Sequence, residues 1–269
     1  MAPPRGIDHV VLATRDLEAT RAAWQALGFT LTPRAQHPFG TDNALIQLHG
    51  NFVELLTVAR AEQIPPHGPG RFSFGAFNRD FLALREGFSM LVLDSADAEA
   101  DRRAFAAANL SAYERFDFSR QARLPDGSSA TVAFSLAFAT DPRMPEAAFF
   151  TCQQHAPQYF WKPDYQRHAA GAWRIAEIVM AAETPGELAD FFEKLQGRSA
   201  VTRDGEALRV ATTRGAISVE TPIALGRRYG REVVSPTPRL VGLKIETFGG
   251  APRTVEIAGT MVELAPLRP

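Results

Sequence analysis

The pattern of hydrophobic and polar positions repeats along the chain. Residues 7–13 are a short run rich in β-branched side chains, and residues 17–27 carry apolar side chains at helical spacing. Asp16 stands where its carboxylate can cap the amino end of this helix, and Gly28 stands where the helix can end. The sequence therefore predicts a strand followed by a helix near the amino terminus.

The same pattern returns further along the chain. Residues 175–181 repeat the strand, and the helix follows after Thr184 and Glu187, whose spacing is typical of a capping box. Another copy starts near Phe88. A last opening strand, at 240–246, is followed by glycine and proline where a helix is expected, so this copy is predicted to lack its helix.

Short strands are predicted after each helix, at 29–32, 44–48, 52–58, 130–138, 148–153, 208–212 and 216–220. Pro125-Asp126-Gly127 is typical of a hairpin turn. The repeating unit is thus a strand, a helix and three strands, which predicts an α+β fold of βαβββ units. Two such units side by side curl their sheets around an internal cleft.

Proline- and glycine-rich linkers are expected at 64–70, 156–171 and 226–239. The second of these separates two pairs of units. We therefore expect one domain over residues 1–160, which holds the functional cleft, and another over residues 172–269, in which the last unit is degenerate.

Charge and composition exclude several classes of protein. The 269 residues include 29 Lys plus Arg and 30 Asp plus Glu, a net charge of −1, which is not the pattern of a nucleic-acid or membrane-surface binder. No apolar run reaches the roughly 20 residues that span a bilayer, and no secretory signal is visible. A single cysteine, Cys152, excludes an intramolecular disulfide. We expect a folded cytoplasmic protein that binds neither nucleic acid nor membrane.

Many of the 19 phenylalanines cluster between Phe72 and Phe160. One interpretation is an ordinary hydrophobic core, because each buried Phe removes a large apolar area from water. The other is an apolar cavity for a small ligand. The sequence contains no Gly-x-Gly-x-x-Gly motif and no phosphate-binding loop, so no nucleotide cofactor is expected.

Two predicted strands carry residues with catalytic chemistry, His9 and Glu54. A glutamate in an apolar strand needs a partner, and His9 can be that partner with or without a metal. The alternative for His9 is a core histidine whose nitrogens bond to the backbone. His37 and Asn43 flank a Gly-Thr turn, as pocket-rim contacts or as a local turn, and Arg120 is a candidate anchor for an anion or an ordinary exposed arginine.

These residues lie in segments that resemble the vicinal oxygen chelate superfamily, the glyoxalase and extradiol dioxygenase group, and especially its glyoxalase-like bacterial branch. The resemblance rests on residues 7–12, 37–45 and 52–56. In metal-binding members, a residue facing the cleft on the first strand and a glutamate on the fourth bind the metal, and His9 and Glu54 match these positions.

The third metal ligand is less clear from the resemblance. The second unit has Met90 at the place of His9 and no glutamate near residues 151–153, so His155 is the nearest imidazole. In the second pair of units Glu177, Glu220 and Glu263 occupy or echo the ligand positions, and no histidine joins them. We expect that second pair to be structural.

The resemblance implies a metal-dependent lyase, isomerase or dioxygenase that acts on a small oxygenated organic molecule. Its metal, Fe, Mn, Ni or Zn, would be held by His9, Glu54 and His155, or His9 and Glu54 would act as an acid–base pair. The substrate contacts expected are His37, Asn43, Arg120 and Trp161. The alternative is a metal-free binding protein that sequesters a small hydrophobic ligand in the Phe-lined cleft. A monomer and a homodimer are both consistent with the repeats.

Overall fold

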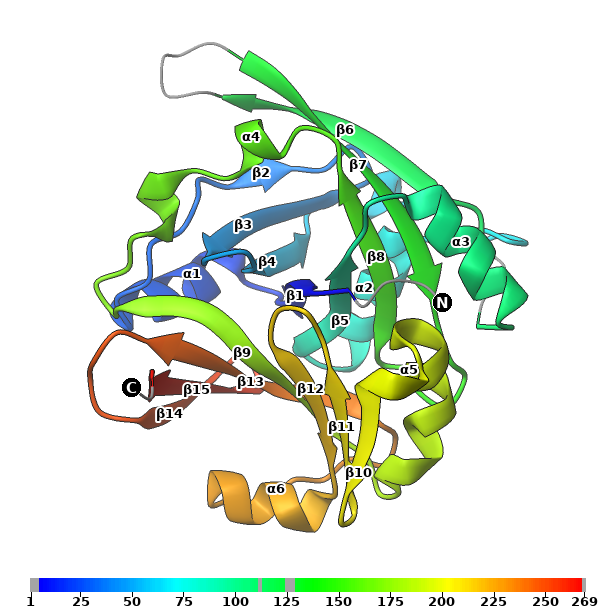
Figure 1. Ribbon diagram of the computed structural model, residues 1–269. Coiled ribbons are helices and arrows are strands. Elements are labelled where there is room, and N and C mark those ends of the chain that lie inside the picture. The colour runs from blue at the N-terminus through cyan, green and yellow to red at the C-terminus, as the bar shows by residue number, and fades with distance from the viewer. Residues whose placement is uncertain (1–4, 111–112, 124–128, 268–269) are drawn as a thin grey trace.

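The computed structural model describes residues 5–110, 113–123 and 129–267, and its strands form two curled mixed sheets (Figure 1). The first sheet contains, in spatial order, β2 (Ala35–Gln36), β3 (Thr41–Gln47), β4 (Phe52–Val58), β1 (Ile7–Ala13), β5 (Gly87–Asp94), β8 (Ala148–Gln154), β7 (Ser129–Ala139) and β6 (Phe116–Arg123). The second contains β10 (Val201–Asp204), β11 (Ala207–Ala211), β12 (Ala216–Glu220), β9 (Ala172–Ala181), β13 (Arg239–Thr247), β15 (Thr260–Pro266) and β14 (Arg253–Ile257).

Each sheet consists of two units that meet at an antiparallel pair of opening strands. β1 pairs with β5 in the first sheet, and β9 pairs with β13 in the second. Within a unit the opening strand pairs in parallel with the last strand, as β1 does with β4 and β5 with β8. The predicted α+β fold of paired units is confirmed.

The helices are α1 (Leu17–Ala26), α2 (Phe74–Leu84), α3 (Ala98–Ala107), α4 (Pro157–Phe160), α5 (Ala189–Gln196) and α6 (Pro222–Tyr229). Asp16 caps α1 by accepting a hydrogen bond from the Ala19 amide, and Gly28 follows the helix with φ +89°. Asp97 caps α3 in the same way. The local sequence was sufficient to predict where these helices begin and end, because capping depends on a few adjacent residues.

Other elements differ from the prediction. Thr184 makes no side-chain capping bond, because the first turn after it is a 3-10 turn that precedes α5. Residues 29–32 form no strand, while the short β2, the long β6 and β10 have no counterpart in the prediction. The helices α2 and α6 were not predicted either. The expected turn at residues 125–127 lies outside the described residues, and the last unit lacks its helix as predicted.

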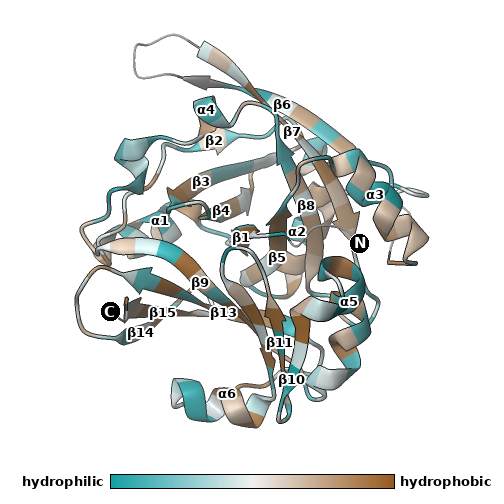
Figure 2. Cartoon of the chain, in the orientation of Figure 1, coloured by the Kyte–Doolittle hydropathy of each residue, from teal (hydrophilic) through white to brown (hydrophobic). Residues whose placement is uncertain are grey.

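The middle strands of the first sheet, such as β1 and β3, are buried on both faces. The helix-facing side of this sheet belongs to one apolar cluster that includes Trp24 and Phe149 and continues into the second sheet through Ile178 and Leu243. A separate apolar cluster covers its concave face. Apolar residues accordingly concentrate on the strands in the middle of the molecule, such as β5 and β11 (Figure 2). The concave cluster is the one that surrounds the cavity described below.

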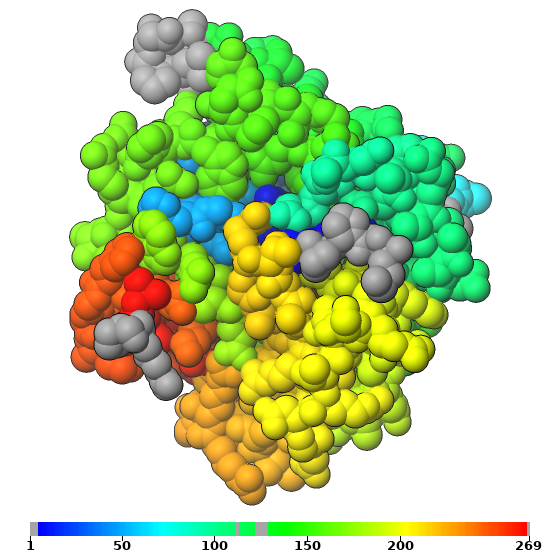
Figure 3. All heavy atoms as spheres, in the orientation of Figure 1, coloured from blue at the N-terminus to red at the C-terminus, as the bar shows by residue number. Residues whose placement is uncertain are grey.

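The two halves of the chain contact each other closely. The Arg5 guanidinium donates to the Leu195 carbonyl, and the His49 ring stacks on Trp173 at 3.5 Å between ring centroids. The space-filling view shows atoms of both halves meeting along a continuous boundary (Figure 3). The division into residues 1–160 and 172–269 stays a prediction, since the sheets share one apolar core. Among the described residues, no helix is long and apolar enough to cross a membrane.

Candidate functional site

A cavity of about 50 Å³ lies against the concave face of the first sheet. Its walls are mostly aromatic. Its charged, imidazole and amide groups come from β1, β3, β4 and β6, and His37 comes from the turn between β2 and β3. The cavity is lined by His9, His37, Phe39, Asn43, Leu45, Phe52, Glu54, Phe74, Phe118, Arg120, Phe134, Leu136, Phe150, Cys152 and Phe160. We call it the inner cavity.

Glu54, on β4, is the centre of the polar groups in the inner cavity. The Asn43 side-chain amide donates a 2.6 Å hydrogen bond to Glu54 Oε1. His9 Nε2 lies 3.6 Å from Glu54 Oε2, and His37 Nε2 lies 3.8 Å from Oε1. All four side chains are buried. The structure therefore brings together His9, Glu54, His37 and Asn43, four of the residues singled out in the sequence.

Asp8 is a further member of the site. In a regular strand its side chain would point to the face opposite His9. The pairing of β1 with β5 shifts between Ile7 and His9, as in a β-bulge, so that Asp8 is the extra residue. Its Oδ2 lies 2.7 Å from His9 Nδ1, and its Oδ1 accepts a hydrogen bond from Gln154. The bulge thus turns Asp8 toward the imidazole beside it.

The contact with Asp8 defines the orientation of His9. Because a carboxylate accepts hydrogen bonds, His9 Nδ1 carries the proton, and in the neutral ring Nε2 then presents its lone pair to Glu54. The ring itself is held by stacking on Phe52, with 4.2 Å between the centroids. His9 Nε2 and Glu54 Oε2 therefore face each other across 3.6 Å, and with the ring neutral both are acceptors. A proton on His9 Nε2, or a donor group of a ligand bound beside the two atoms, satisfies them.

His37 is a neutral imidazole in this cluster. Its Nδ1 lies 2.9 Å from Thr41 Oγ1, and its Nε2 accepts a 3.3 Å hydrogen bond from the Asn43 amide. Burial lowers the pKa of His37 to about 4, although the negative charge of Glu54 opposes this shift. The ring therefore stays uncharged at neutral pH and adds no positive charge to the cavity.

Arg120 lies on β6 at the edge of the inner cavity and also lines a larger cavity of about 400 Å³, which we call the outer cavity. The guanidinium is half-buried, and among the described residues it has no hydrogen-bond or ion-pair partner. Burial lowers the pKa of Arg120, and Glu54 acts in the opposite direction. Trp161 lines neither cavity and instead contacts Phe52 and Phe160.

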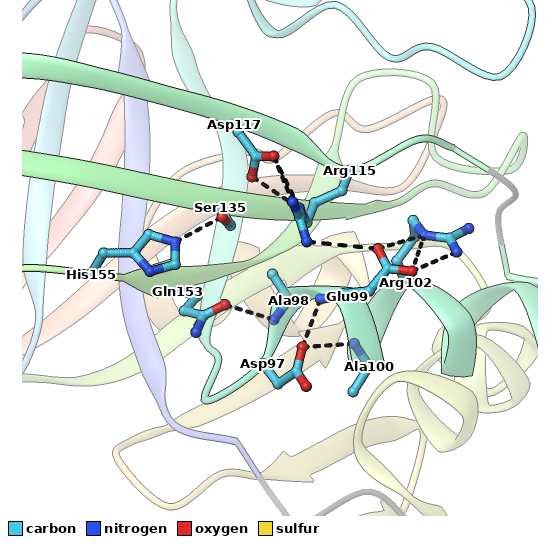
Figure 4. A network of polar contacts seen from close by, with 10 residues as sticks. All are labelled: Asp97, Ala98, Glu99, Ala100, Arg102, Arg115, Asp117, Ser135, Gln153 and His155. Carbon is cyan, nitrogen blue, oxygen red and sulfur yellow. Dashed lines mark hydrogen bonds and ion pairs between the residues drawn. The ribbon is translucent and has the colours of Figure 1, made fainter.

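His155 does not join His9 and Glu54. Phe150, Cys152 and Gln154 share the concave face of β8, and His155 follows one position later, on the other side. It hydrogen-bonds Ser135 across 2.8 Å (Figure 4). It also lines a separate surface hollow. The metal ligand set of His9, Glu54 and His155 expected from the sequence is therefore not formed.

The remaining donors in the inner cavity do not replace His155. The described residues contain no group of three His, Cys, Asp or Glu side chains placed to hold a metal ion. Cys152 faces the cavity, but burial raises its pKa well above the ordinary value, and the charges of Asp8 and Glu54 raise it further. Its thiol is therefore protonated and a poor metal ligand. The donor set fits an acid–base pair better than a three-ligand metal site.

The corresponding place in the second sheet is filled by an arginine. Arg228, from α6, makes 2.7 Å contacts with Glu177, Glu220 and Glu263. These are the three carboxylates that the sequence analysis placed at the ligand positions of the second pair of units. The guanidinium neutralises them, and α6 closes that side of the sheet, which agrees with the expected structural role.

Comparisons with known proteins agree with this architecture. A family model described as a glyoxalase-like domain matches residues 7–196. A hypothetical protein from Staphylococcus aureus has a similar structure, with 15% identity, a TM-score of 0.73, and coverage of 98% of this chain and 100% of that one. A mutant of 4-hydroxymandelate synthase from Streptomyces coelicolor is 10% identical, with a TM-score of 0.50 over 92% of this chain and 72% of that one.

At these identities the two solved structures establish the fold alone. No curated protein matches the sequence. The family model, however, spans more than half of the chain and includes β1, β4 and both residues of the facing pair, His9 and Glu54. The protein therefore belongs to the glyoxalase-like domain family.

Proposed function

We propose that the inner cavity is the active site of a lyase or isomerase in which His9 and Glu54 move a proton to or from a small oxygenated organic molecule. The observation that carries this proposal is the 3.6 Å gap between His9 Nε2 and Glu54 Oε2. Two such atoms facing each other in an apolar cavity are arranged to take a proton from a ligand bound beside them. Such proton transfer contributes roughly 10²- to 10⁴-fold to a reaction rate.

The neighbouring residues give the two Glu54 oxygens different roles. Asn43 donates to Oε1, which leaves Oε2 as the oxygen that faces His9 and the ligand. Asp8 fixes the His9 ring, so that Nε2 is the nitrogen available to the ligand. Glu54 Oε2 accepts the proton from a carbon next to a carbonyl group. His9 Nε2, which faces Oε2, then takes that proton from Glu54 and donates it to the oxygen on which negative charge has developed.

The sequence also predicts a divalent metal, and metal-dependent dioxygenase chemistry belongs to that prediction. His9 and Glu54 supply two of the side chains needed, while a redox metal in the usual facial arrangement takes three. Neither His155 nor the protonated Cys152 is suited to be the third. We therefore propose that the side chains themselves transfer the proton.

The alternative is a metal-free protein that sequesters a hydrophobic ligand. The apolar lining favours it, but the size of the inner cavity does not. A cavity that binds benzene has a volume of roughly 150 Å³, whereas the inner cavity has about 50 Å³. Only a small polar or aliphatic end of a ligand fits beside Glu54, which supports a site for reaction over a site for storage.

Exchange of carbon-bound protons in deuterated water tests the proposal without knowledge of the full reaction. A panel of small hydroxycarbonyl compounds, neutral and anionic, is incubated with the protein and followed by NMR. Wild type is expected to accelerate exchange next to the carbonyl, and Glu54→Gln and His9→Gln to lose about 100-fold or more of that rate. Arg115→Gln, on the far side of the sheet, is the matched control and keeps the wild-type rate.

Equal exchange rates in wild type, Glu54→Gln and His9→Gln would overturn the proposal. Binding of panel members without exchange would favour the sequestering protein instead. Melting temperatures of each variant establish that a lost rate reflects lost chemistry and not unfolding.

A further inference from the structure

The inner and outer cavities meet at four residues that line both. These are Asn43, Leu45, Arg120 and Phe160. The inner cavity has about 50 Å³ and the outer one about 400 Å³. A ligand that reaches Glu54 therefore has a small end inside, a middle beside these four residues, and any larger part in the outer cavity.

Arg120 supplies a charge at this junction that forms no ion pair or hydrogen bond with the described residues. A half-buried cation of this kind is unfavourable, because it gives up hydration and only the charge of Glu54, beyond ion-pair distance, opposes that cost. Its neighbour in the outer cavity, Arg34, is already paired with Asp42 at 2.7 Å. The described lining of the outer cavity includes Arg34, Arg120 and Lys162 and no acidic residue. The junction is therefore complementary to an anion.

Asn43 supplies an unpartnered acceptor at the same junction. Its amide group donates to Glu54 and to His37, which fixes the orientation of the side chain. Its Oδ1 is then left buried, with no hydrogen-bond partner among the described residues, although the side chain is only 3% exposed. A buried acceptor without a partner costs free energy, and a hydroxyl group of a ligand would satisfy it.

We propose that the ligand of this site is a small hydroxycarboxylate, whose carboxylate binds the Arg120 guanidinium and whose hydroxyl donates to Asn43 Oδ1. The inference rests on the proposed function, because it concerns the same cavity. Arginine is suited to this role, since its planar guanidinium matches a carboxylate with two parallel hydrogen bonds. The remaining carbon atoms of the ligand lie against Leu45 and Phe160, which continue the apolar walls.

A panel of three compounds separates the two contacts. 3-Hydroxybutanoate carries both groups, 3-hydroxybutanamide lacks the charge, and butanoate lacks the hydroxyl. Wild type is expected to bind the hydroxy acid about 10- to 100-fold more tightly than its amide, as measured by calorimetry, because a hydrogen bond to a charged group is lost. Butanoate is expected to bind more weakly than the hydroxy acid by a smaller factor.

Arg120→Gln is expected to abolish the preference for the acid over the amide and to leave affinity for the amide unchanged. Arg120→Lys should restore part of the preference, since it restores the charge without the planar fork. Arg115→Gln removes a charge from an exposed position next to the same strand and should keep the preference. The melting temperature of ligand-free Arg120→Gln should equal or exceed that of wild type, because an unpaired charge is removed.

Equal affinity of wild type for the acid and the amide overturns the inference, as does an acid preference that survives in Arg120→Gln. No binding of any panel member at millimolar concentration also overturns it. Proton exchange on neutral compounds but not on anionic ones would overturn the inference and leave the proposed function standing. Conversely, an acid preference that depends on Arg120, together with no exchange on any compound, overturns the proposed function and supports the inference.

Discussion

Asp8 and His9 are consecutive residues of β1, yet their side chains meet, with 2.7 Å between Asp8 Oδ2 and His9 Nδ1. Adjacent residues of a regular strand point to opposite faces and cannot do this. The irregular pairing with β5 between Ile7 and His9 allows the two side chains to reach each other. A local backbone irregularity therefore determines which nitrogen of His9 faces Glu54.

Asp8→Asn should lower the proton-exchange rate by about 100-fold or more, as much as loss of the His9 imidazole itself, because the carboxylate that holds the imidazole in its tautomer is removed. The amide can present its NH2 group to Nδ1, which favours the wrong tautomer of His9. We expect kcat to fall with little change in KM, because Asp8 does not contact the ligand. Gln154→Ala, which removes only the amide that donates to Asp8, should have a much smaller effect. An unchanged kcat in Asp8→Asn would refute this role.

Stability should depend on pH through His37. The unfolded chain protonates this residue near pH 6.5, whereas burial lowers the pKa in the folded protein to about 4. Between these values the unfolded state binds the extra proton, so the free energy of unfolding falls as the pH falls from about 6.5 to 4. The loss is at most about 3 kcal/mol, from about 1.4 kcal/mol for each pKa unit.

Urea unfolding at a series of pH values measures this dependence. His37→Gln should show a flatter profile between pH 6.5 and 4, whatever its absolute stability. His155→Gln changes an exposed histidine and should leave the wild-type slope. A profile of His37→Gln that is parallel to that of wild type would contradict the assignment of His37 as a buried neutral base.

The parts of the fold predicted from the sequence depend on short-range chemistry. Asp16 and Gly28 delimit α1 because capping and left-handed termination involve neighbouring residues. The repeats then predict the pairing of units, since each unit has one apolar face to bury. His9 and Glu54 were singled out by the family resemblance together with strand alternation, and they lie on the concave face of adjacent strands.

What the sequence did not predict depends on long-range geometry. Asp8 joins the site through a bulge that leaves no trace in the hydrophobic pattern. His155 was assigned as a ligand because it is near β8 in sequence. Side chains alternate between the two faces of a strand, however, so His155, one position after Gln154, lies on the face away from the cavity. Arg228 gave no sequence signal, because only α6 brings its guanidinium to the three glutamates of the second sheet.

The donor set of the inner cavity also predicts the response to metals. Protein purified without a histidine tag should contain no stoichiometric Fe, Mn, Ni or Zn, and a chelator should leave proton exchange unchanged. A metal present at about 1,000 times its dissociation constant would add about 4 kcal/mol to the free energy of unfolding. We expect no such gain. The change in the free energy of unfolding on addition of metal should be small, and the same in wild type and Glu54→Gln. Stoichiometric metal that is lost in Glu54→Gln would restore the metal-dependent hypothesis.

Arg228 should be essential for stability and not for chemistry. Arg228→Met leaves Glu177, Glu220 and Glu263 without their shared cation in a site where each is at most 19% exposed. Breaking a buried ion pair by removal of one partner typically costs 3–5 kcal/mol, and residual solvent contact reduces this to about 2 kcal/mol. Arg209→Gln, at a more exposed partner of Glu177, should cost less than about 1 kcal/mol.

Neutralising the glutamates separates charge from packing in this cluster. If the cost of Arg228→Met comes from uncompensated carboxylates, adding Glu177→Gln, Glu220→Gln and Glu263→Gln to it should recover most of the lost stability in urea unfolding. If the cost comes from lost contacts of the arginine stem, the combined variant should be less stable still. Proton exchange in the inner cavity should be the same in the folded fraction of every variant, because α6 and the second sheet contribute no residue to its lining.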